Sequence, residues 1–372
     1  MNFIDDKRIV MTLDAGGTNL VFTALQGQKQ IISEITLPSN ADNLDRCISS
    51  IINGFEEVKK NLNQPPAAIS FAFPGPADYL NGIIGDLPNL PAFRGGIALG
   101  PLLQEKFNLP VYINNDGDLF TFGEAIAGYL PYVNNLLEKS GSPKRYKNLL
   151  GLTLGTGFGA GIARDGNLFL GDNSIAGEIW LLRDVLNPSV NVEEHVSIRG
   201  LRKAYALEAG MDLEDSPSPF ELYKIASGEQ PGNKQAALEA FKKMAKTAGD
   251  AISNAITLVD GLVVIGGGLA GASDIFLPYL IDEMNSSYIL PDGKKFKRLV
   301  ANVYNLEDPE QLNRFLKGSA KEIPVYNTGK KIKYDPELRI GVGISKLGAS
   351  RAIFIGAYAF ALKMLDQKKA FN

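Results

Sequence analysis

The chain has 372 residues, of which 45% are hydrophobic and 21% charged, and 38 basic against 41 acidic residues give a formal net charge of −3. This composition indicates a globular protein of two or three domains, and the near balance of charge argues against a surface for nucleic acid or an anionic membrane. The single cysteine, Cys47, excludes an intramolecular disulfide and a multi-cysteine zinc site, and the single histidine, His195, excludes a site built on several histidines. Because no signal-peptide core and no run of about 20 apolar residues is present, we expect a cytoplasmic protein without a membrane span.

The first part of the chain predicts strands separated by short turns. Apolar runs predict strands at residues 9–13, 20–25, 31–37, 68–73 and 111–114. The glycine-rich sequence DAGGTN joins the first two strands, and Asn-Asp follows the last one. Apolar side chains at helical spacing predict a helix over 44–62, and the same spacing resumes at Leu119.

The second part of the chain repeats this design. A strand at 149–154 leads into the turn GTGFGAG, after which the chain runs outward again, and a helix at 234–259 precedes a strand at 262–265 and the glycine-rich GGGLAGA. The polar segment 286–337 is typical of an irregular insertion, and residues 351–365 predict an amphipathic helix. Two strand–turn–strand units of this kind predict a two-lobed α/β fold with a cleft between the lobes.

The turn at 14–19 has the composition of a phosphate-binding loop. Its two glycines let backbone N–H groups face an anion, and Asp14 at the strand end could hold Mg²⁺ directly or through water. Thr18 and Asn19 could donate hydrogen bonds to phosphate. A tight hairpin turn without a ligand is an equally good interpretation when this motif is read alone.

Two later glycine runs allow the same two interpretations. LGTGFGAG, residues 154–161, places Thr156 between glycines, but it is neither a Walker A loop nor a dinucleotide-binding fingerprint. VVIGGGLAGA, residues 263–272, leads from a strand into a helix, where N-terminal N–H groups could face a nucleotide. The alternative for the first is a simple hairpin, and for the second it is close helix–strand packing.

Two carboxylates are candidates for the sugar side of a cleft. Asp116 lies just past a strand end, where it could act as general base for a hydroxyl nucleophile, although capping of the following helix by Asp116 or Asp118 is the better interpretation when this motif is read alone. Glu178 in AGEIW could accept hydrogen bonds from a sugar diol, or be an ordinary solvated carboxylate. Trp180 is interpreted as a core residue, and His195 as a surface or packed residue without a catalytic role.

The order of these motifs resembles the ROK family (repressors, open reading frames and kinases) of the hexokinase–actin–heat-shock ATPase superfamily. The resemblance is carried by DAGGTN, FPGP, PNL, NND, LGTGFGAG, AGE, IGGGLA and LGASRAIFIGA, and it covers nearly all of the chain. It implies an actin-like, ribonuclease H-like ATPase fold with an interlobe cleft. The implied smaller lobe comprises residues 1–117 and 350–372, and the larger lobe comprises 118–349.

The resemblance also implies roles for individual residues. The first phosphate loop comprises Asp14, Gly16, Gly17, Thr18 and Asn19. The second phosphate loop comprises Gly155, Thr156, Gly157 and Gly159. The adenosine motif comprises Gly266, Gly267 and Gly268. The residues implied at the sugar are Asp116 as catalytic base and Gly75, Asn89, Asn115, Glu178 and Glu193 as ligands.

The chain departs from the family pattern at several positions. Asn19 stands where the family commonly has lysine, and Trp180 and Leu181 stand where typical members have Gly-His, whose histidine contacts both zinc and sugar. The cysteine cluster that precedes VEEHVS in the family is also missing, so we expect no structural zinc. Only residues 1–8 precede the first strand, which leaves no room for the DNA-binding domain of family repressors.

The sequence therefore predicts an ATP-dependent hexose kinase, glucokinase-like, that phosphorylates a sugar hydroxyl with Asp116 as base and with ATP and Mg²⁺ as cofactors. The resemblance implies the 6-hydroxyl as acceptor and a homodimer as the assembly. An N-acetylhexosamine or fructose kinase of the same family, or a non-enzymatic sugar sensor, remain alternatives. Epimeric sugars differ by one hydroxyl, so the motifs do not name the sugar.

Overall fold

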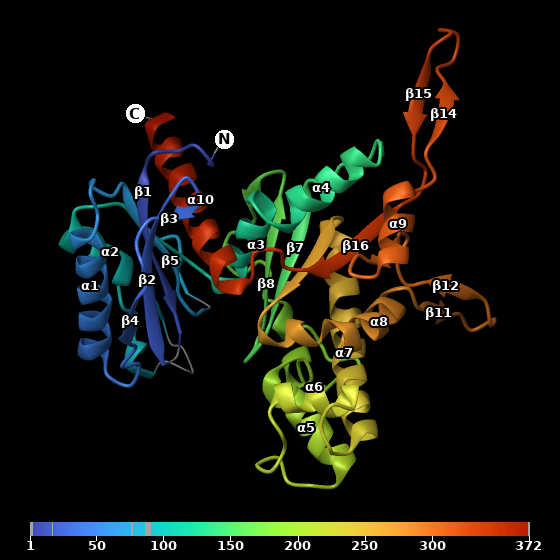
Figure 1. The fold of residues 1–372 in the computed structure, drawn as a ribbon, viewed down its shortest axis with the longest axis horizontal. Helices are drawn as coiled ribbons and strands as arrows, with labels where there is room; N and C mark the ends of the chain where they lie inside the picture. Colours follow the sequence, from blue (N-terminus) through green and yellow to red (C-terminus); the bar gives the residue numbers. More distant parts are fainter. Residues whose placement is uncertain (1–2, 17, 76, 86–90, 371–372) are drawn as a thin grey trace.

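Two six-stranded sheets lie on either side of a long C-terminal helix in the computed structural model, which describes residues 3–16, 18–75, 77–85 and 91–370 (Figure 1). The molecule is elongated, and its two sheets follow the first and second parts of the sequence. This arrangement matches the two-lobed α/β fold expected from the motifs. The division into lobes at 1–117 plus 350–372 and 118–349 stays a prediction.

The first sheet has the strand order β3-β2-β1-β5-β6, with β4 pairing to β2. Its strands are β1 (Ile9–Ala15), β2 (Asn19–Gln26), β3 (Lys29–Gln30), β4 (Ile35–Pro38), β5 (Ala68–Ala72) and β6 (Val111–Asn114). β1, β5 and β6 run parallel, so their carboxyl ends meet at one edge of the sheet. One face packs against α1 (Leu44–Lys60) and α2 (Leu99–Phe107) in a core rich in phenylalanine.

The second sheet has the order β13-β16-β10-β7-β8-β9. Its strands are β7 (Asn148–Leu154), β8 (Phe158–Arg164), β9 (Asn167–Leu168), β10 (Leu262–Gly266), β13 (Asn302–Asn305) and β16 (Arg339–Ile344). β13, β16, β10 and β7 are parallel, and β8 returns antiparallel to β7. Parallel strands buried on both faces explain the continuous apolar runs at β7 and β10.

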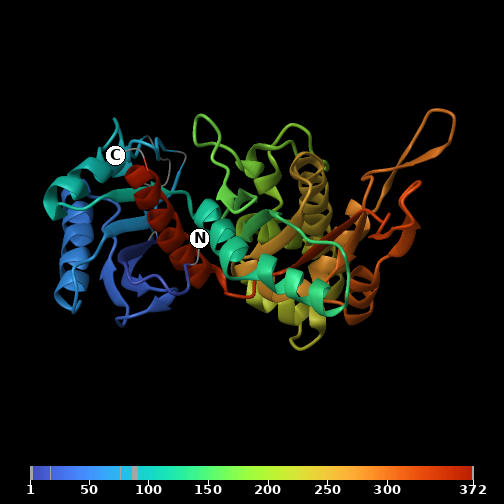
Figure 2. The same ribbon diagram turned by 90° about the horizontal axis from the view of Figure 1, so that it is seen from above.

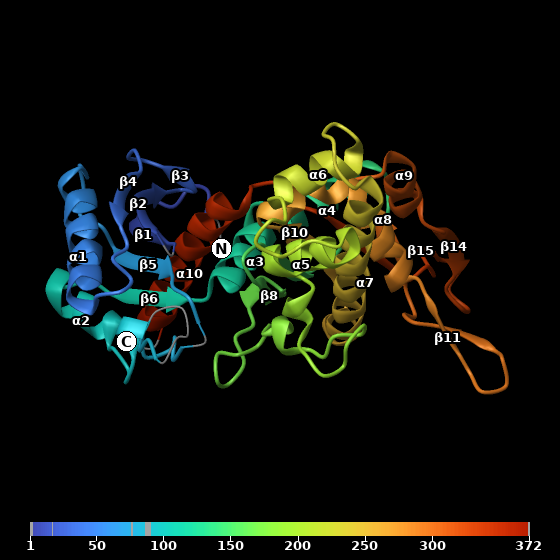
Figure 3. The ribbon, with the colours of Figure 1, turned by 90° about the horizontal axis from the view of Figure 1, so that it is seen from below.

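Helices cover both faces of the second sheet. The helices are α3 (Asp116–Ile126), α4 (Tyr129–Lys139), α5 (Ile198–Ala209), α6 (Pro219–Ser227), α7 (Lys234–Val259), α8 (Ser273–Met284) and α9 (Pro309–Lys317). The side chains of α5 to α8 share one core with the sheet, and those of α3, α4 and α9 share another (Figure 3). Within the described ranges, no helix combines the length and apolarity needed to cross a bilayer.

Helix α10 (Ala349–Ala370) lies between the two sheets, against α3 and the first sheet (Figures 1 and 2). Glycines allow a very close approach of α3 and α10, because a Cβ at Gly123 would lie 2.0 Å from the carbonyl oxygen of Ala352, and one at Gly356 would lie 1.9 Å from that of Leu119. The helix expected over 351–365 is confirmed as part of α10, but the expectation that it is amphipathic was wrong. Elements on both sides cover α10, so residues 352–359 are buried around the whole circumference.

Three local predictions differ from the structure. Of the strand expected at 31–37, residues 35–37 lie in β4 and residues 31–34 are not in a strand. The short β3 precedes this range, and β3 and β4 pair with two parts of the same edge of β2. The turn GTGFGAG is shorter than expected, because β8 begins at Phe158. The segment 286–337 is not irregular, because it supplies β13 to the second sheet and contains α9.

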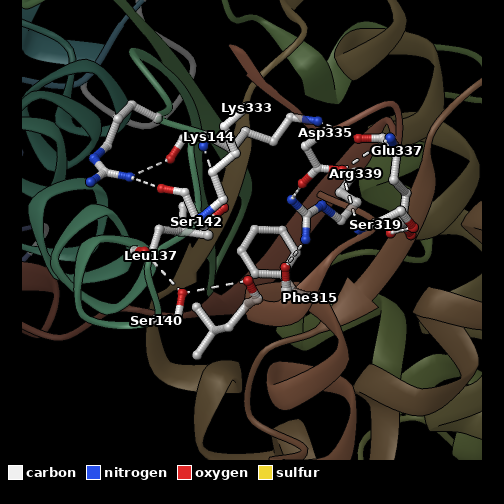
Figure 4. A network of polar contacts seen from close by, with 12 residues as sticks. Leu137, Ser140, Ser142, Lys144, Phe315, Ser319, Lys333, Asp335, Glu337 and Arg339 are labelled. Carbon is white, nitrogen blue, oxygen red and sulfur yellow. Dashed lines mark hydrogen bonds and ion pairs between the residues drawn. The ribbon is translucent and has the colours of Figure 1, made fainter. Parts of the chain in front are cut away.

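The polarity of this segment comes from two hairpins that extend away from the second sheet. These are β11 (Ser287–Ile289) with β12 (Lys295–Lys297), and β14 (Lys321–Pro324) with β15 (Lys331–Tyr334) (Figure 1). A polar network fixes the base of the second hairpin (Figure 4). In it the buried Arg339 pairs with Asp335 and donates to the carbonyl oxygen of Phe315.

Candidate active site

A cavity of about 410 Å³ lies between the carboxyl ends of the first sheet and the β7–β8 turn. This volume is within the usual range for a small-molecule site. Its walls include most of the residues singled out in the sequence. From that set it collects Gly75, Asn115, Asp116, Gly155, Thr156, Gly157, Gly159, Glu178, Glu193 and Gly267. Helix α10 also contributes to the wall, through Ala349 and Ile353.

Asp116 begins α3 directly after β6, and its side chain opens into this cavity. The cap of α3 is Asn115, whose side-chain oxygen accepts the Gly117 N–H at 2.8 Å. Asp116 Oδ1 accepts the same N–H at 2.9 Å. Capping therefore falls mainly to Asn115, which leaves the second oxygen of Asp116 for a ligand. Surrounding protein raises the pKa of Asp116, against the opposing effect of the Gly117 N–H, and a raised pKa suits a general base.

Three carboxylates at or beside the cavity, those of Asp116, Asp118 and Glu178, are near enough to affect one another. Asp118, in the first turn of α3, is 2% exposed, and burial together with the charges of Glu178 and Asp116 raises its pKa well above the usual range. Burial also raises the pKa of Glu178, an effect that a hydrogen bond from Trp180 opposes. Hydrogen bonds from hydroxyl groups, or a bound cation, would reduce the electrostatic repulsion between carboxylates that lie this close together.

The first turn lies beside the cavity without lining it. Asp14 ends β1 and is half-buried; burial raises its pKa, a hydrogen bond with Ser350 opposes this rise, and the Asp116 charge adds to it. Gly16 N–H donates to the Asn19 carbonyl oxygen at 2.9 Å, and Thr18 and Asn19 are exposed. Gly17, like Asn89 of the predicted sugar ligands, lies outside the described residues.

The donor set around Asp14 fits Mg²⁺. Asp14 and Asp116 are near enough that the charge of Asp116 raises the pKa of Asp14, and a cation would reverse this repulsion. Mg²⁺ is usually held by one or two carboxylates plus substrate phosphates and water, so a full protein cage is not required. Asp14 would hold the ion, and the ion would neutralise phosphate charge there.

The second turn lines the cavity directly and is hydrogen-bonded to Glu193, which lines the same cavity. Its own backbone closes it, with Gly155 N–H donating to the Gly157 carbonyl oxygen at 3.0 Å. Glu193 Oε2 accepts the Phe158 N–H at 2.9 Å, at the point where β8 begins. Thr156 is exposed at the tip of the turn. Glu193, which the family resemblance implies as a sugar ligand, thus contacts the turn and lines the same cavity.

The glycines at 266–268 differ in role: one fits close helix–strand packing, and another fits a ligand site. Gly266 is packed beneath the Phe120 ring, where a Cβ would lie 2.6 Å from the ring, as close helix–strand packing predicts. Gly267 has φ +89° and lines the cavity. Gly268 is exposed with open space around it, at the start of a 3₁₀ turn over Gly268–Ala272.

Two residues, one in the cavity wall and one beside it, were not selected from the sequence for a role. Trp180 packs partly against the core, as expected, but its indole also lines the cavity and donates to Glu178. Ser350, which contacts Asp14, is part of LGAS, where no chemical signal singled it out. His195 lies away from the cavity and pairs with buried Asp184 at 2.5 Å, in agreement with a packed residue.

Comparisons with known proteins agree with this geometry. The model of the ROK family matches residues 10–305. A solved glucokinase from Parabacteroides distasonis is 52% identical, with a TM-score of 0.88, over 98% of this chain and 99% of its own. The N-acetyl-D-glucosamine kinase of Photobacterium profundum is 26% identical over 69% of this chain and 83% of its own.

A more distant structure shows the shared fold. A ROK family glucokinase from Streptomyces griseus, solved in complex with glucose and AMPPNP, is 17% identical, with a TM-score of 0.59, over 94% of this chain and 98% of its own. The two-lobed actin-like fold expected from the sequence is thereby confirmed.

Proposed function

The chain belongs to the ROK family, its relatives support a sugar phosphotransferase, and we propose that it transfers the γ-phosphate of ATP to the 6-hydroxyl of a hexose. Glucose is the first candidate, because the 52%-identical structure is described as a glucokinase. The observation that carries the proposal is the position of Asp116. Its carboxylate opens into the same cavity as the second glycine turn, which brings a base and a phosphate-binding loop together.

Asp116 acts as the general base in this proposal. Its raised pKa makes it a stronger proton acceptor than an ordinary aspartate, and its free oxygen receives the proton of the attacking sugar hydroxyl. Asn115 lies beside it, and Glu178 and Glu193 face the same space as acceptors for other sugar hydroxyls. Gly75 allows close approach of the sugar, and Asn89 is retained as a proposed ligand from the motif.

The glycine turns act on the phosphates. Thr156 and the N–H groups of residues 155–159 face the cavity and would stabilise charge on the transferred group. Asp14 holds Mg²⁺, and Gly16 to Asn19 complete the first loop. Gly267 borders the cavity where a nucleotide would meet β10, with Gly266 beneath it and Gly268 beside it. Closure of the two lobes would exclude water from the transfer.

Two alternatives use the same cavity. An N-acetylhexosamine kinase is supported by the relative that acts on N-acetyl-D-glucosamine, and a fructose kinase would use the same base. A sugar sensor without transfer would need Asp116 for binding alone. Retention of a base and a phosphate turn in one cavity favours the enzyme.

A coupled ADP-release assay with MgATP tests the proposal. Glucose, mannose, fructose, N-acetylglucosamine and N-acetylmannosamine are compared, and the product is identified by NMR to locate the phosphate. Asp116→Asn should lower kcat about 10²–10⁴-fold while sugar affinity stays within about threefold. Sugar binding without turnover by the wild type would favour the sensor, and near-normal turnover by Asp116→Asn would remove Asp116 as base. Light scattering tests the proposed homodimer.

A further inference from the structure

The indole of Trp180 and the carboxylate of Glu178 form one unit in the cavity wall. Both belong to the turn around the 3₁₀ segment Ile179–Leu181, and the Trp180 ring N–H donates to Glu178 Oε2. Both side chains also line the cavity that contains Asp116. A tryptophan in this position therefore has a polar contact as well as a packing role.

Building on the proposed function, we propose that Trp180 is a positioning residue that fixes Glu178, through its indole N–H, as an ionised acceptor for a sugar hydroxyl. The bond engages Oε2, which leaves Oε1 available to a ligand in the cavity that Glu178 lines. Trp180 is thus responsible for sugar affinity without taking part in proton transfer.

The electrostatic surroundings show why Glu178 needs such a donor. Its carboxylate is half-buried, and the charges of Asp116 and Glu193 both oppose its ionisation. Asp118 lies close enough to feel the charge of Glu178 as well. Within the described ranges, the Trp180 N–H is the one hydrogen-bond donor that contacts the Glu178 side chain. Without it, the carboxylate would take up a proton or turn away from its neighbours.

The packing of Trp180 makes it an effective support. Its ring is half-buried against the core formed by the second sheet and α5 to α8. A free glutamate side chain must lose rotamer freedom to hold a ligand, whereas one held by an anchored indole is already ordered. Charge-assisted hydrogen bonds of this kind are stronger than neutral ones.

The variant Trp180→Phe removes the N–H and keeps an aromatic ring in the wall. The sugar KM should rise about tenfold, with kcat within about threefold, as expected for loss of a hydrogen bond to a charged group. The acid limb of kcat/KM for the sugar should also shift to higher pH, because Glu178 loses the contact that favours its ionised form. A purely structural role would leave this limb in place.

Two further variants separate positioning from packing. In a Glu178→Gln background, Trp180→Phe should have little additional effect on KM, because the partner charge is already absent. Trp180→His, which returns a ring N–H, should recover part of the affinity. Circular dichroism and thermal melts check that each variant folds. Additive effects of the two substitutions, or an unchanged acid limb, would overturn the proposal.

The chain has one tryptophan, so its fluorescence reports on this site directly. Sugar should change the emission of the wild type, and Glu178→Gln should change it without sugar. Calorimetry gives the sugar affinity of Trp180→Phe. If the wild type binds sugar without turnover and Trp180→Phe binds it more weakly, the kinase proposal is refuted and the role of Trp180 stands. If the wild type turns over and Trp180→Phe has the same KM and pH profile, the kinase proposal stands and the role of Trp180 is refuted. If the wild type neither binds nor turns over any sugar, both proposals are refuted.

Discussion

The hairpins β1–β2 and β7–β8 have the same design and different surroundings. Each is an antiparallel pair closed by a glycine turn, and in each the first strand also pairs in parallel with a neighbour. At the turn of the first hairpin lies the carboxylate of Asp14, which forms a hydrogen bond with Ser350 at the start of α10. The second turn carries Thr156 and is held by Glu193 from the sugar side.

This difference suggests a division of labour between the two turns. A carboxylate beside the phosphates serves a metal ion, whereas backbone N–H groups and a hydroxyl serve the phosphate oxygens. In the proposed site, Glu193 would make the second turn responsive to the sugar, because its carboxylate accepts the Phe158 N–H and lines the cavity. The first turn instead contacts α10, through the hydrogen bond between Asp14 and Ser350.

The largest expected effect is loss of the Asp14 carboxylate. Asp14→Asn should lower kcat/KM for MgATP about 10²–10³-fold, comparable to removal of a principal charge-stabilising group. Thr156→Ala, in the equivalent turn, should cost about tenfold, because one hydroxyl donor is lost among several N–H groups. Steady-state kinetics at varied Mg²⁺ measure both. Equal losses in the two variants would contradict the division of labour.

The second prediction concerns the support of the β7–β8 turn. Gly267→Ala should lower the free energy of unfolding by about 2–4 kcal/mol, since a Cβ would lie 2.3 Å from the Leu154 carbonyl oxygen and φ is +89°. Gly268→Ala is the matched control, because it has open space around it and should change stability by less than about 1 kcal/mol. Urea unfolding compares them, and similar midpoints would show that β10 does not constrain this turn.

The third prediction separates the two contacts of Glu193. Glu193→Gln keeps an oxygen acceptor for the Phe158 N–H and loses the charge, whereas Glu193→Ala loses both. The KM for sugar should rise about fivefold in the first variant and about 20-fold in the second, with KM for ATP raised in the second alone. If both variants leave KM for ATP unaltered, Glu193 does not join the turn to the sugar side.

The sequence predicted the strands and turns of both hairpins well, because their apolar runs and glycines are local signals. The sequence did not predict the strands and helix within 286–337. Two exposed hairpins make this segment polar, although its strand β13 belongs to the second sheet. The sequence predicted the helix at 351–365 but misread it as amphipathic, because the burial of residues 352–359 depends on contacts with elements more than 200 residues away. Burial on two sides cannot be read from the period of one helix.

The candidate site shows the same contrast. Motifs led to Asp116, the second turn and Glu178, which the structure brings into one cavity. The role of Asn115 as helix cap and the contact of Trp180 with Glu178 depend on side-chain direction, which spacing along the chain does not give. Trp180 was interpreted as a core residue because tryptophan is usually buried. The contact of its ring N–H with Glu178 is seen in the folded structure and could not be predicted from the sequence.

The smallest expected effect tests whether the carboxylate beneath the second hairpin carries charge. Asp118 lies on α3 against β8, and burial together with the charges of Glu178 and Asp116 raises its pKa, so the native state keeps this proton to a higher pH than the unfolded chain does. This contribution lowers the stability of the wild type as pH rises from about 4 towards the native pKa. Asp118→Asn removes it, so the variant should gain about 1–2 kcal/mol relative to the wild type at pH 8 and almost nothing at pH 4. Urea unfolding across this range, with the exposed Asp212→Asn as control, measures the difference. A gain independent of pH would show that Asp118 is ionised in the fold, and that the charge on the sugar side is greater than the proposed site assumes.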